Sequence, residues 1–566
     1  MSSHIRNWCR ISSRVQSSNE WLDCAALLVS GLITGLVFET ERGAPLLWFS
    51  LAPFARYAQR SPTATVTCAA YFGLVSFHLV GLHFMAKTGH PEFTVCWMLI
   101  SHGLSIFCLF VLNATRSIVG RSGYAFALVP LAWVGKDSIV EYGAEYVIGS
   151  RFPFLQLGLT QIDMWFVQLS DIGGIPLITF LLLMSNVIVA DIVQKVVRRN
   201  AVREFRTQLV SLVVIAIIPY GYRIHRIYFT NLNPGPTVVL TAAPIPVREI
   251  HQEARRIQSI SLQKPITASG NIDGHQRPLV SIWPEASTGF AYFDKADDAQ
   301  ASPTIHRLKD FAVKLQTPII VGGGRCSPAT GERFNSVFFI DGNGEYLDYY
   351  DKQNIGPGDE FQPPLASLVE KLSGCKILDP AKFGWVGTSK GERQTPNVVL
   401  QAGSQKYVIA PSICFDIWFP DCFRRDGISS PDFFVNIADE VFSGDRTQFS
   451  YRGWALASAR MRAIENRRSV VRCVGDGSTA VIDPLGRIVA LQTGRSDRKK
   501  TIVCSVPICA DRKSILFLPI GPVAAGFVLA LLMVTIVRWS IERVRYWLFT
   551  STASRFHESQ LVRKKK

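Results

Sequence analysis

Long runs of apolar residues, separated by short polar loops, dominate the first 222 positions of the chain. Seven runs precede the central segment, and an eighth lies near the C-terminus. They cover residues 21–38, 45–55, 65–85, 93–114, 124–140, 164–193, 209–222 and 515–537. A helix needs about 20 apolar residues to cross the hydrocarbon core of a bilayer. Counting the short second run, the pattern predicts a membrane bundle of about eight helical spans, about seven of them within residues 1–222.

The basic residues in the loops predict the orientation of this bundle. Lysine and arginine gather in alternate loops, at 56–60, 116–121 and 195–206, and again after the last run. Because basic loops tend to stay in the cytoplasm, both ends of the chain are expected inside. The large segment 223–513 is then expected outside. The last span covers residues 514–538, and residues 539–566 form a basic cytoplasmic tail.

The segment 223–513 has a different pattern. Short runs rich in Val and Ile alternate with stretches of helical character, which predicts a layered α/β domain. Strands are expected near 279–283, 318–321, 408–413 and 433–437, and helices near 304–315 and 448–468. The Asp-Gly-Asn-Gly and Asp-Pro-Leu-Gly sequences at 341–344 and 483–486 are typical of hairpin turns.

Composition agrees with a membrane protein and argues against other classes. Hydrophobic residues make up 48% of the 566 positions, too many for a wholly soluble chain. The net charge of +16 would suit nucleic-acid binding if it formed one patch, but the basic residues lie beside the apolar runs. Anionic lipid headgroups are therefore the expected partners, and nucleic acid is not. The twelve cysteines include no Cys-x-x-Cys pair, so neither a metal site nor a disulfide framework is predicted.

Three reactive side chains stand where a predicted strand meets a loop. Glu285 follows Ile-Trp-Pro, Lys352 follows Tyr-Tyr-Asp, and Cys414 follows Pro-Ser-Ile. A free thiol with a pKa near ~8.5 is mostly protonated at neutral pH, so it needs a base such as Glu285 before it attacks. A fixed ammonium such as Lys352 stabilises the oxyanion that the attack creates. Each residue alone has an ordinary structural explanation, but their combination indicates a cysteine nucleophile.

These segments resemble the signatures of the carbon–nitrogen hydrolase, or nitrilase, superfamily. The whole chain is also similar to the apolipoprotein N-acyltransferase family, bacterial inner-membrane enzymes that N-acylate lipoproteins. Residues 151–158, 351–363, 460–468 and 477–483 carry the similarity along the chain. The resemblance implies a nitrilase-like αββα sandwich on the periplasmic side of the inner membrane, carried by a multi-pass bundle. It implies no metal and no dissociable cofactor.

The resemblance also implies a two-step reaction. Cys414 would take a fatty acyl chain from a phospholipid as a thioester, and the α-amine of a diacylglyceryl-modified lipoprotein cysteine would accept it. Glu285 would act as general base and then acid, and Lys352 would stabilise the oxyanion. Two further sets of residues are expected, one supporting the site and one lining the substrate entrance. They are Glu360, Asp416 and Asn436 for support, and Phe152, Phe154 and Phe442 for the entrance.

The chain departs from the family pattern in a loop beside the expected site. Where the family has Ser-Asn-Asp-Ala-Trp-Phe-Gly, residues 438–444 read Ala-Asp-Glu-Val-Phe-Ser-Gly. The loop keeps its length, gains acidity and loses the Trp-Phe pair, which bears on the choice of acyl donor. After Cys414, the family's Tyr-Glu is replaced by Phe415 and Asp416, which keep a carboxylate on a shorter side chain.

Two other functions fit parts of the pattern. A membrane-anchored amidase or nitrilase would hydrolyse a small carbon–nitrogen bond with the same three residues. A transporter or scaffold would carry a catalytically inactive outer domain. The multi-span bundle and the loop at 152–158 favour acyl transfer, because a lipid substrate needs a cleft open to the membrane. The presence of Glu285, Lys352 and Cys414 together argues against an inactive domain.

Overall fold

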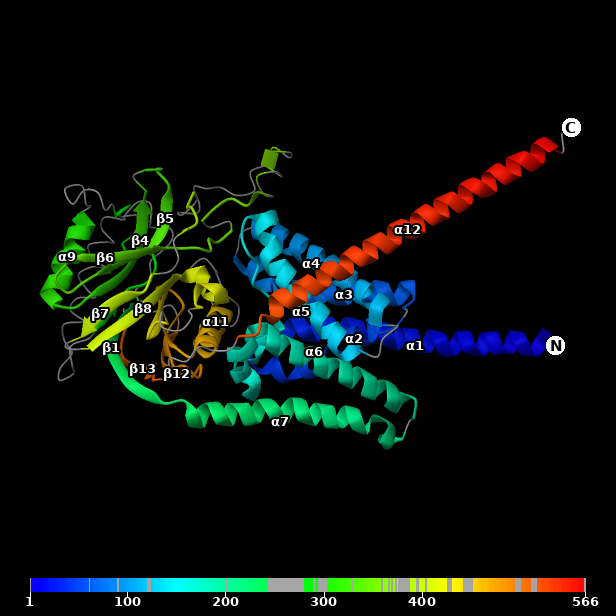
Figure 1. Ribbon diagram of the computed structural model, residues 1–566, viewed down its shortest axis with the longest axis horizontal. Helices are drawn as coiled ribbons and strands as arrows, with labels where there is room; N and C mark the ends of the chain where they lie inside the picture. The colour runs from blue at the N-terminus through cyan, green and yellow to red at the C-terminus, as the bar shows by residue number, and fades with distance from the viewer. Residues whose placement is uncertain are drawn as a thin grey trace.

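A helix bundle and a β-rich domain lie end to end in the computed structural model of the chain (Figure 1). The structure describes residues 2–60, 62–88, 91–119, 124–199, 201–242, 279–288, 292–293, 303–327, 329–357, 360–364, 367, 370–371, 374, 387–392, 396–402, 405–424, 430–440, 451–493, 500–510 and 517–563. Helices α1 and α12, which carry the two chain ends, both point away from the β-rich domain (Figure 1).

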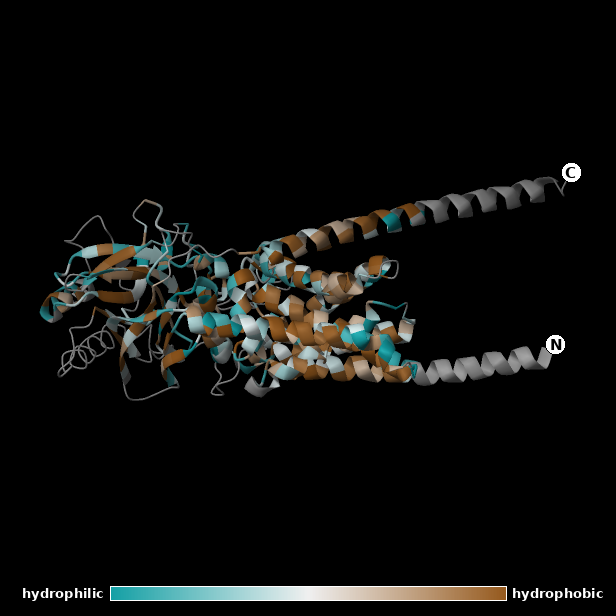
Figure 2. Ribbon diagram, turned by 60° about the horizontal axis from the view of Figure 1, so that its bottom comes forward, coloured by the Kyte–Doolittle hydropathy of each residue, from teal (hydrophilic) through white to brown (hydrophobic). Residues whose placement is uncertain are grey.

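Long helices form the bundle, and apolar residues cover much of their surface (Figure 2). Among the described residues, six helices are long and apolar enough to cross a membrane. A further helix, α5, is 24 residues long but carries four charged side chains. The long helices are α1 (Ser2–Val37), α3 (Ala64–Gly81), α4 (Pro91–Val119), α5 (Ala125–Ile148), α6 (Ser170–Val197), α7 (Arg206–Phe229) and α12 (Ile520–Arg563). The expectation of a multi-span helical bundle is confirmed.

The apolar run at 45–55 does not form the short span that was expected. It folds into a 3-10 helix, η1 (Glu41–Trp48), and the six-residue α2 (Ala52–Tyr57). Six helical residues rise only ~9 Å, far less than the ~30 Å of a hydrocarbon core. The buried Asn186 of α6 holds the turn, since its amide donates to the Leu47 oxygen at 2.7 Å and accepts from the Leu51 nitrogen at 2.8 Å. Leu47, Leu51 and Phe54 of this run are buried in the core of the bundle, whereas Leu46 and Phe49 are exposed.

Two sheets form the β-rich domain, residues 232–509. The first sheet has the order β13-β1-β2-β4-β5-β6, with β3 beside β4, and the second has the order β12-β11-β10-β9-β8-β7. The strands of the first sheet are β1 (Leu232–Ala242), β2 (Val280–Ile282), β3 (Tyr292–Phe293), β4 (Ile319–Cys326), β5 (Arg333–Ile340), β6 (Tyr346–Asp351) and β13 (Lys500–Cys509). Those of the second are β7 (Val398–Ala402), β8 (Gln405–Ile413), β9 (Phe433–Ala438), β10 (Ser469–Val474), β11 (Ser478–Ile482) and β12 (Ile488–Thr493).

The domain has four layers, because the two sheets pack face to face and a helix covers the outer face of each. Ile282 and Val337 of the first sheet share one core with Ile413 and Val435 of the second. Helix α9 (Pro303–Leu315) covers the outer face of the first sheet. Helix α11 (Tyr451–Asn466) covers the outer face of the second sheet and lies toward the bundle (Figure 1). The expected α/β domain with an αββα arrangement is confirmed, and α11 brings the second sheet close to the membrane part.

The predicted strands and turns within this domain are also confirmed. Each of the four expected strands overlaps a strand of the sheets, and both expected helices form as α9 and α11. The turns at 341–344 and 483–486 join β5 to β6 and β11 to β12 in antiparallel hairpins. Gly344 and Gly486 have φ values of +81° and +76°, which glycine adopts without strain.

Candidate active site

Cys414 lies where β8 ends and the 3-10 helix η8 (Cys414–Trp418) begins. Its φ of +44° is in the left-handed region, which costs a non-glycine residue ~1–3 kcal/mol and occurs mainly at functional sites. The side chain is half-buried, and Sγ lies 3.9 Å from the backbone oxygen of Asp439. A cysteine that only filled the core would need no such strained turn.

Glu285 and Lys352 meet Cys414 at the same edge of the sandwich. Glu285 lies three residues after β2, and Lys352 follows β6 directly. Lys352 Nζ lies 3.3 Å from Glu285 Oε1, and both charges act on the Cys414 thiol, because Glu285 raises its pKa and Lys352 lowers it. Lys352 and Glu285 are both buried. The structure therefore brings together the three residues that the sequence singled out.

Glu360 is the second carboxylate beside the lysine. Its Oε2 lies 2.8 Å from Lys352 Nζ and accepts a hydrogen bond from the Gly356 nitrogen at 2.6 Å. The side chain is 1% exposed, so the ion pair is shielded from water. Two carboxylates on one ammonium hold Lys352 in a single position, as expected of a residue that orients it.

Asn335, in the middle of β5, connects the two carboxylates. Its side-chain nitrogen donates to Glu285 Oε1 at 2.6 Å and to Glu360 Oε1 at 2.8 Å. Its backbone oxygen accepts from the Lys352 nitrogen at 2.8 Å. The sequence analysis missed this residue. The available signal was an amide in a strand that is otherwise apolar toward the core, since a buried amide requires hydrogen-bond partners.

The peptide of Asp439 completes the contacts of the base. Its nitrogen donates to Glu285 Oε2 at 2.9 Å, while its oxygen faces Cys414 Sγ. Both oxygens of Glu285 are therefore engaged, Oε1 by Asn335 and Lys352 and Oε2 by this peptide. Asp439 belongs to the loop 438–444, whose sequence differs from the family pattern. This loop therefore contacts Glu285 and Cys414 through its backbone.

The charges in the site set the protonation states of the thiol and the amine. Burial raises the pKa of the Cys414 thiol well above its ordinary value; Glu285 raises it further, and Lys352 lowers it. Burial alone would lower the pKa of Lys352, but Cys414, Glu285 and Glu360 outweigh this effect and raise it well above its ordinary value. The resting site thus contains a neutral thiol and a permanent ammonium, and the thiol needs a base to react.

Asp416 and Asn436 support the backbone around the nucleophile. Buried Asp416 accepts hydrogen bonds from the Tyr350 hydroxyl at 2.8 Å and from the Asn354 side chain at 2.9 Å, which ties the nucleophile turn to the segment after Lys352. Asn436 donates to the Ser412 hydroxyl at 3.0 Å and accepts from Arg472. Both side chains thus stabilise the strand ends that carry Cys414.

Glu440 and Arg472 form a further ion pair that sequence reasoning missed. Both side chains are 1% exposed, and Arg472 bonds to Glu440 and to Asn436 together. The acidity gained in the 438–444 loop is thus partly neutralised inside the protein. Only residues 438–440 of this loop are described, and the entrance candidate Phe442 lies outside the described residues.

Phe152 and Phe154 lie in the bridging loop, residues 149–156, between α5 and the 3-10 helix η3 (Leu157–Gln161). The Phe154 ring packs edge-on against Trp418, with ring centres 5.2 Å apart, and lies 6.1 Å from Phe415. Phe152 packs edge-on against Phe154 at 5.1 Å. The bundle therefore contributes an aromatic surface to the segment that begins with Cys414.

Within the part of the chain that the structure describes, no three His, Cys, Asp or Glu side chains form a group that could hold an ion. The two carboxylates of the site, Glu285 and Glu360, hold the ammonium of Lys352 instead.

The sandwich and its Glu, Lys and Cys set are similar to those of carbon–nitrogen hydrolases, and the family model described as Carbon-nitrogen hydrolase matches residues 279–507. The family model described as Apolipoprotein N-acyltransferase N-terminal domain matches residues 30–188. The chain is thus similar to apolipoprotein N-acyltransferases over most of its length.

Individual relatives named apolipoprotein N-acyltransferase match most of the chain. An apolipoprotein N-acyltransferase of Geobacter metallireducens is 25% identical over 485 residues, which cover 82% of this chain and 86% of the relative. The enzyme of the same name from Haemophilus influenzae is 21% identical over 500 residues, covering 86% and 90%. Among solved structures, Saccharomyces cerevisiae Nit3, a member of the nitrilase superfamily, aligns with 50% of this chain and 92% of its own, at 15% identity and a TM-score of 0.35.

Proposed function

We propose that the protein transfers a fatty acyl group from a phospholipid, through a thioester on Cys414, to the α-amine of the N-terminal diacylglyceryl-cysteine of lipoproteins. One observation carries the proposal: a half-buried thiol, linked to Glu285 through the peptide of Asp439, lies beside an aromatic surface that comes from an apolar bundle. The resemblance to apolipoprotein N-acyltransferases supports the acyltransferase assignment and the membrane location.

The first half-reaction loads the enzyme. Glu285 takes the thiol proton as Cys414 Sγ attacks the ester carbonyl of the phospholipid. Lys352 is placed to stabilise the resulting oxyanion, an interaction typically worth ~3 kcal/mol. The ester carbon–oxygen bond then breaks, Glu285 gives its proton to the departing lysophospholipid oxygen, and the acyl chain remains on sulfur.

The second half-reaction releases the chain to the acceptor. The α-amine of the lipoprotein cysteine attacks the thioester, and Glu285 accepts a proton from the attacking nitrogen. The carbon–sulfur bond breaks and Sγ recovers the proton, which restores the neutral thiol favoured by its raised pKa. The products are an amide on the lipoprotein and the resting enzyme.

In this proposal, the lipid substrate reaches the site from the bundle, and the β-rich domain provides the catalytic residues. Phe152 and Phe154 would line the entrance, because Phe154 packs on Trp418 and Phe415, which follow the nucleophile in the chain, and Phe152 packs on Phe154. With basic loops inside, the β-rich domain would face the periplasm, where the amino-terminal cysteine of a lipoprotein is available. No step requires a metal or a dissociable cofactor.

The test is transfer between defined substrates. Purified protein is incubated with a phospholipid bearing an isotope-labelled sn-1 chain and a peptide with an amino-terminal diacylglyceryl-cysteine. Label is expected in an amide on the peptide with the wild type, and none with Cys414→Ala. If the wild type leaves the peptide unmodified while it hydrolyses small amides, the protein is an amidase of the same class.

A further inference from the structure

The bridging loop, residues 149–156, is fastened to the bundle and to the β-rich domain at once. On the bundle side, the Gln156 amide donates to Glu141 Oε2 at 3.0 Å, and the Phe152 nitrogen donates to the Glu141 oxygen at 3.1 Å. On the other side, the Ser150 hydroxyl donates to the oxygen of Ile355, three residues after Lys352, at 3.0 Å. The loop therefore contacts both helix α5 of the bundle and the segment of the β-rich domain that follows Lys352.

Arg151 makes the strongest of these connections. Its Nη1 donates to both carboxylate oxygens of Asp421, at 2.9 and 2.8 Å, and its Nη2 bonds to Glu141 Oε1. The guanidinium also lies between the rings of Tyr142 and Phe419, 4.4 and 4.2 Å from their centres. A planar guanidinium held by two carboxylates and two rings has very little freedom to move.

The position of Asp421 links this contact to the nucleophile. Asp421 belongs to the 3-10 helix η9 (Pro420–Cys422), which only Phe419 separates from η8, the helix that begins with Cys414. Three residues from Arg151, Phe154 packs on Trp418 at the end of the same η8. Arg151 thus fixes the loop and the nucleophile segment at one point, and Phe154 joins them at another.

We propose that Arg151 is a positioning residue that locks the bridging loop onto η9, so that the aromatic surface of the loop faces an acyl chain on Cys414. The chemistry of the thiol does not depend on it. Its role is to keep the lipid-facing wall at the correct distance and angle when a long chain enters from the bundle. This proposal adds a positioning residue to the proposed function, and it rests on that function for the assumption that Cys414 carries a fatty acyl chain.

Asp421 offers the best variant. Its side chain is 58% exposed, whereas Arg151 and Glu141 are buried, so Asp421→Asn removes the ionic lock without leaving a buried charge unpaired. Asp163→Asn is the matched control, because Asp163 pairs with Arg460 at 2.7 Å across the same interface, is 71% exposed and lies outside the loop. A double variant, Glu141→Gln with Arg151→Gln, removes the buried pair together.

Two readouts separate the lock from general damage. Misplacement by about 1 Å costs up to ~10²-fold in rate, so Asp421→Asn should slow acylation of Cys414 by a long-chain phospholipid by about tenfold. Alkylation of Cys414 by iodoacetamide, which needs no chain, should change less than about twofold. Asp163→Asn should change neither. A parallel loss of acylation and alkylation in Asp421→Asn, or an unchanged acylation rate, would overturn the proposal.

A second measurement, which needs no acyl donor, tests whether the contact between Arg151 and Asp421 holds the bridging loop against η9. Cys422, next to Asp421, is 3% exposed. In a Cys414→Ala background, Asp421→Asn and the double variant should increase maleimide labelling of Cys422, measured by peptide mass, and Asp163→Asn should not. Unchanged labelling in both test variants rejects the lock even if acyl transfer is confirmed. A wild type that takes no acyl chain rejects the proposed function, while the labelling result still stands.

Discussion

At the level of single residues, the site depends on a thiol that is hard to ionise and a base that is fully engaged. The raised pKa of Cys414 means that a free thiolate is rare near neutral pH, which protects the sulfur from unspecific reactions. Glu285 is linked to the thiol through the peptide of Asp439, and the proposed role of its carboxylate is to take the thiol proton as the sulfur attacks a carbonyl.

This arrangement predicts the pH dependence of alkylation. Since the thiol keeps its proton until the pH exceeds its raised pKa, the rate of iodoacetamide reaction at Cys414 should rise with a midpoint above that of glutathione measured in parallel. Peptide mass spectrometry of the Cys414 peptide between pH 6 and about 10 measures it. A midpoint at or below the glutathione value contradicts the account.

Asn335 provides a second test at this scale. Asn335→Ala removes the amide that donates to both Glu285 and Glu360. Without it, the two carboxylates are no longer held in fixed positions around Lys352, and the acylation rate should fall by up to ~10²-fold. Asn343→Ala, in the exposed turn after β5, is the control and should have no effect. Circular dichroism checks that both variants fold. Normal acylation in Asn335→Ala would remove this residue from the account.

Sequence reasoning singled out Glu285, Lys352 and Cys414, which the structure brings together, because each follows a recognisable strand and carries a distinctive chemical group; their catalytic roles stay a prediction. It missed Asn335 and the Arg472–Glu440 pair for a physical reason. Their importance comes from partners on other strands, which only the register of the sheets brings into contact. An isolated polar residue in an apolar strand signals a buried partner but does not say which one.

At the level of elements, the bridging loop, residues 149–156, joins the helix bundle to the segment that begins with Cys414. Its aromatic residues pack against η8, and Phe84, from the 3-10 helix η2 (His83–Thr88) of the bundle, extends the same surface at 5.2 Å from Phe154. Tyr451 at the start of α11 closes it, 5.6 Å from Trp418. Both parts of the molecule thus contribute to one apolar wall.

Phe154→Leu tests this wall. The swap keeps an apolar side chain but removes ring contacts of ~1 kcal/mol, which should raise the KM for a long-chain donor about fivefold and leave kcat nearly unchanged. Phe311→Leu in α9, which packs on the far face of the first sheet, is the matched control. Equal KM values for both variants would mean that Phe154 does not contact the chain.

Strands and turns were predicted correctly from the sequence, but one of the expected membrane spans was not. Strands and hairpins followed from short Val and Ile runs and from glycine turns, because both are local signals. The run at 45–55 was misinterpreted as a span, since apolar composition alone does not distinguish a helix that crosses the bilayer from a segment buried within the bundle. The polar contact of Asn186 with that segment decides the difference, and it comes from 130 positions or more along the chain.

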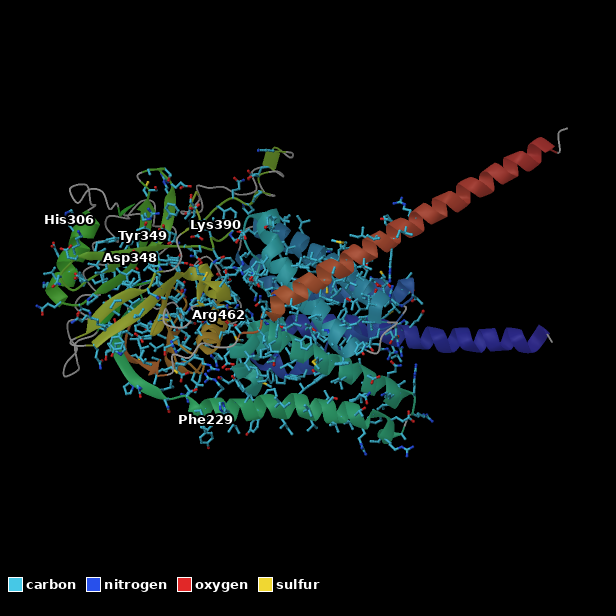
Figure 3. All side chains as sticks on the ribbon, in the orientation of Figure 1. Phe229, His306, Asp348, Tyr349, Lys390 and Arg462 are labelled. Carbon is cyan, nitrogen blue, oxygen red and sulfur yellow. The ribbon has the colours of Figure 1, made fainter. Side chains whose placement is uncertain are left out.

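At the level of the whole molecule, the β-rich domain is fixed to the bundle by a buried charge cluster. Asp171, at the start of α6, accepts from Arg467 at 2.7 Å and from the Tyr222 hydroxyl of α7 at 2.8 Å, and lies 3.1 Å from Arg226. Arg462, on α11 at the side that faces the bundle (Figure 3), donates to the Trp418 oxygen at 3.2 Å. The contacts of Asp171 with Arg467, Tyr222 and Arg226 thus fasten the β-rich domain to helices α6 and α7.

The orientation predicted from the basic loops is testable in cells. A green fluorescent protein fused after Lys566 should fluoresce, because the C-terminus is expected in the cytoplasm. A membrane-impermeant maleimide should label the half-buried Cys326 of the β-rich domain in intact spheroplasts. Labelling of Cys326 only after the membrane is opened would place the β-rich domain inside and contradict the orientation.

The central claim is that Cys414 carries an acyl chain from a lipid, and intact-protein mass spectrometry tests it most directly. After incubation with phospholipid and no acceptor, the wild type should gain the mass of one fatty acyl group. Hydroxylamine should remove that mass, because thioesters are labile to it, and Cys414→Ala should never gain it. A wild type that remains unmodified while it turns over small amides, or an adduct that persists in Cys414→Ala, would contradict the account.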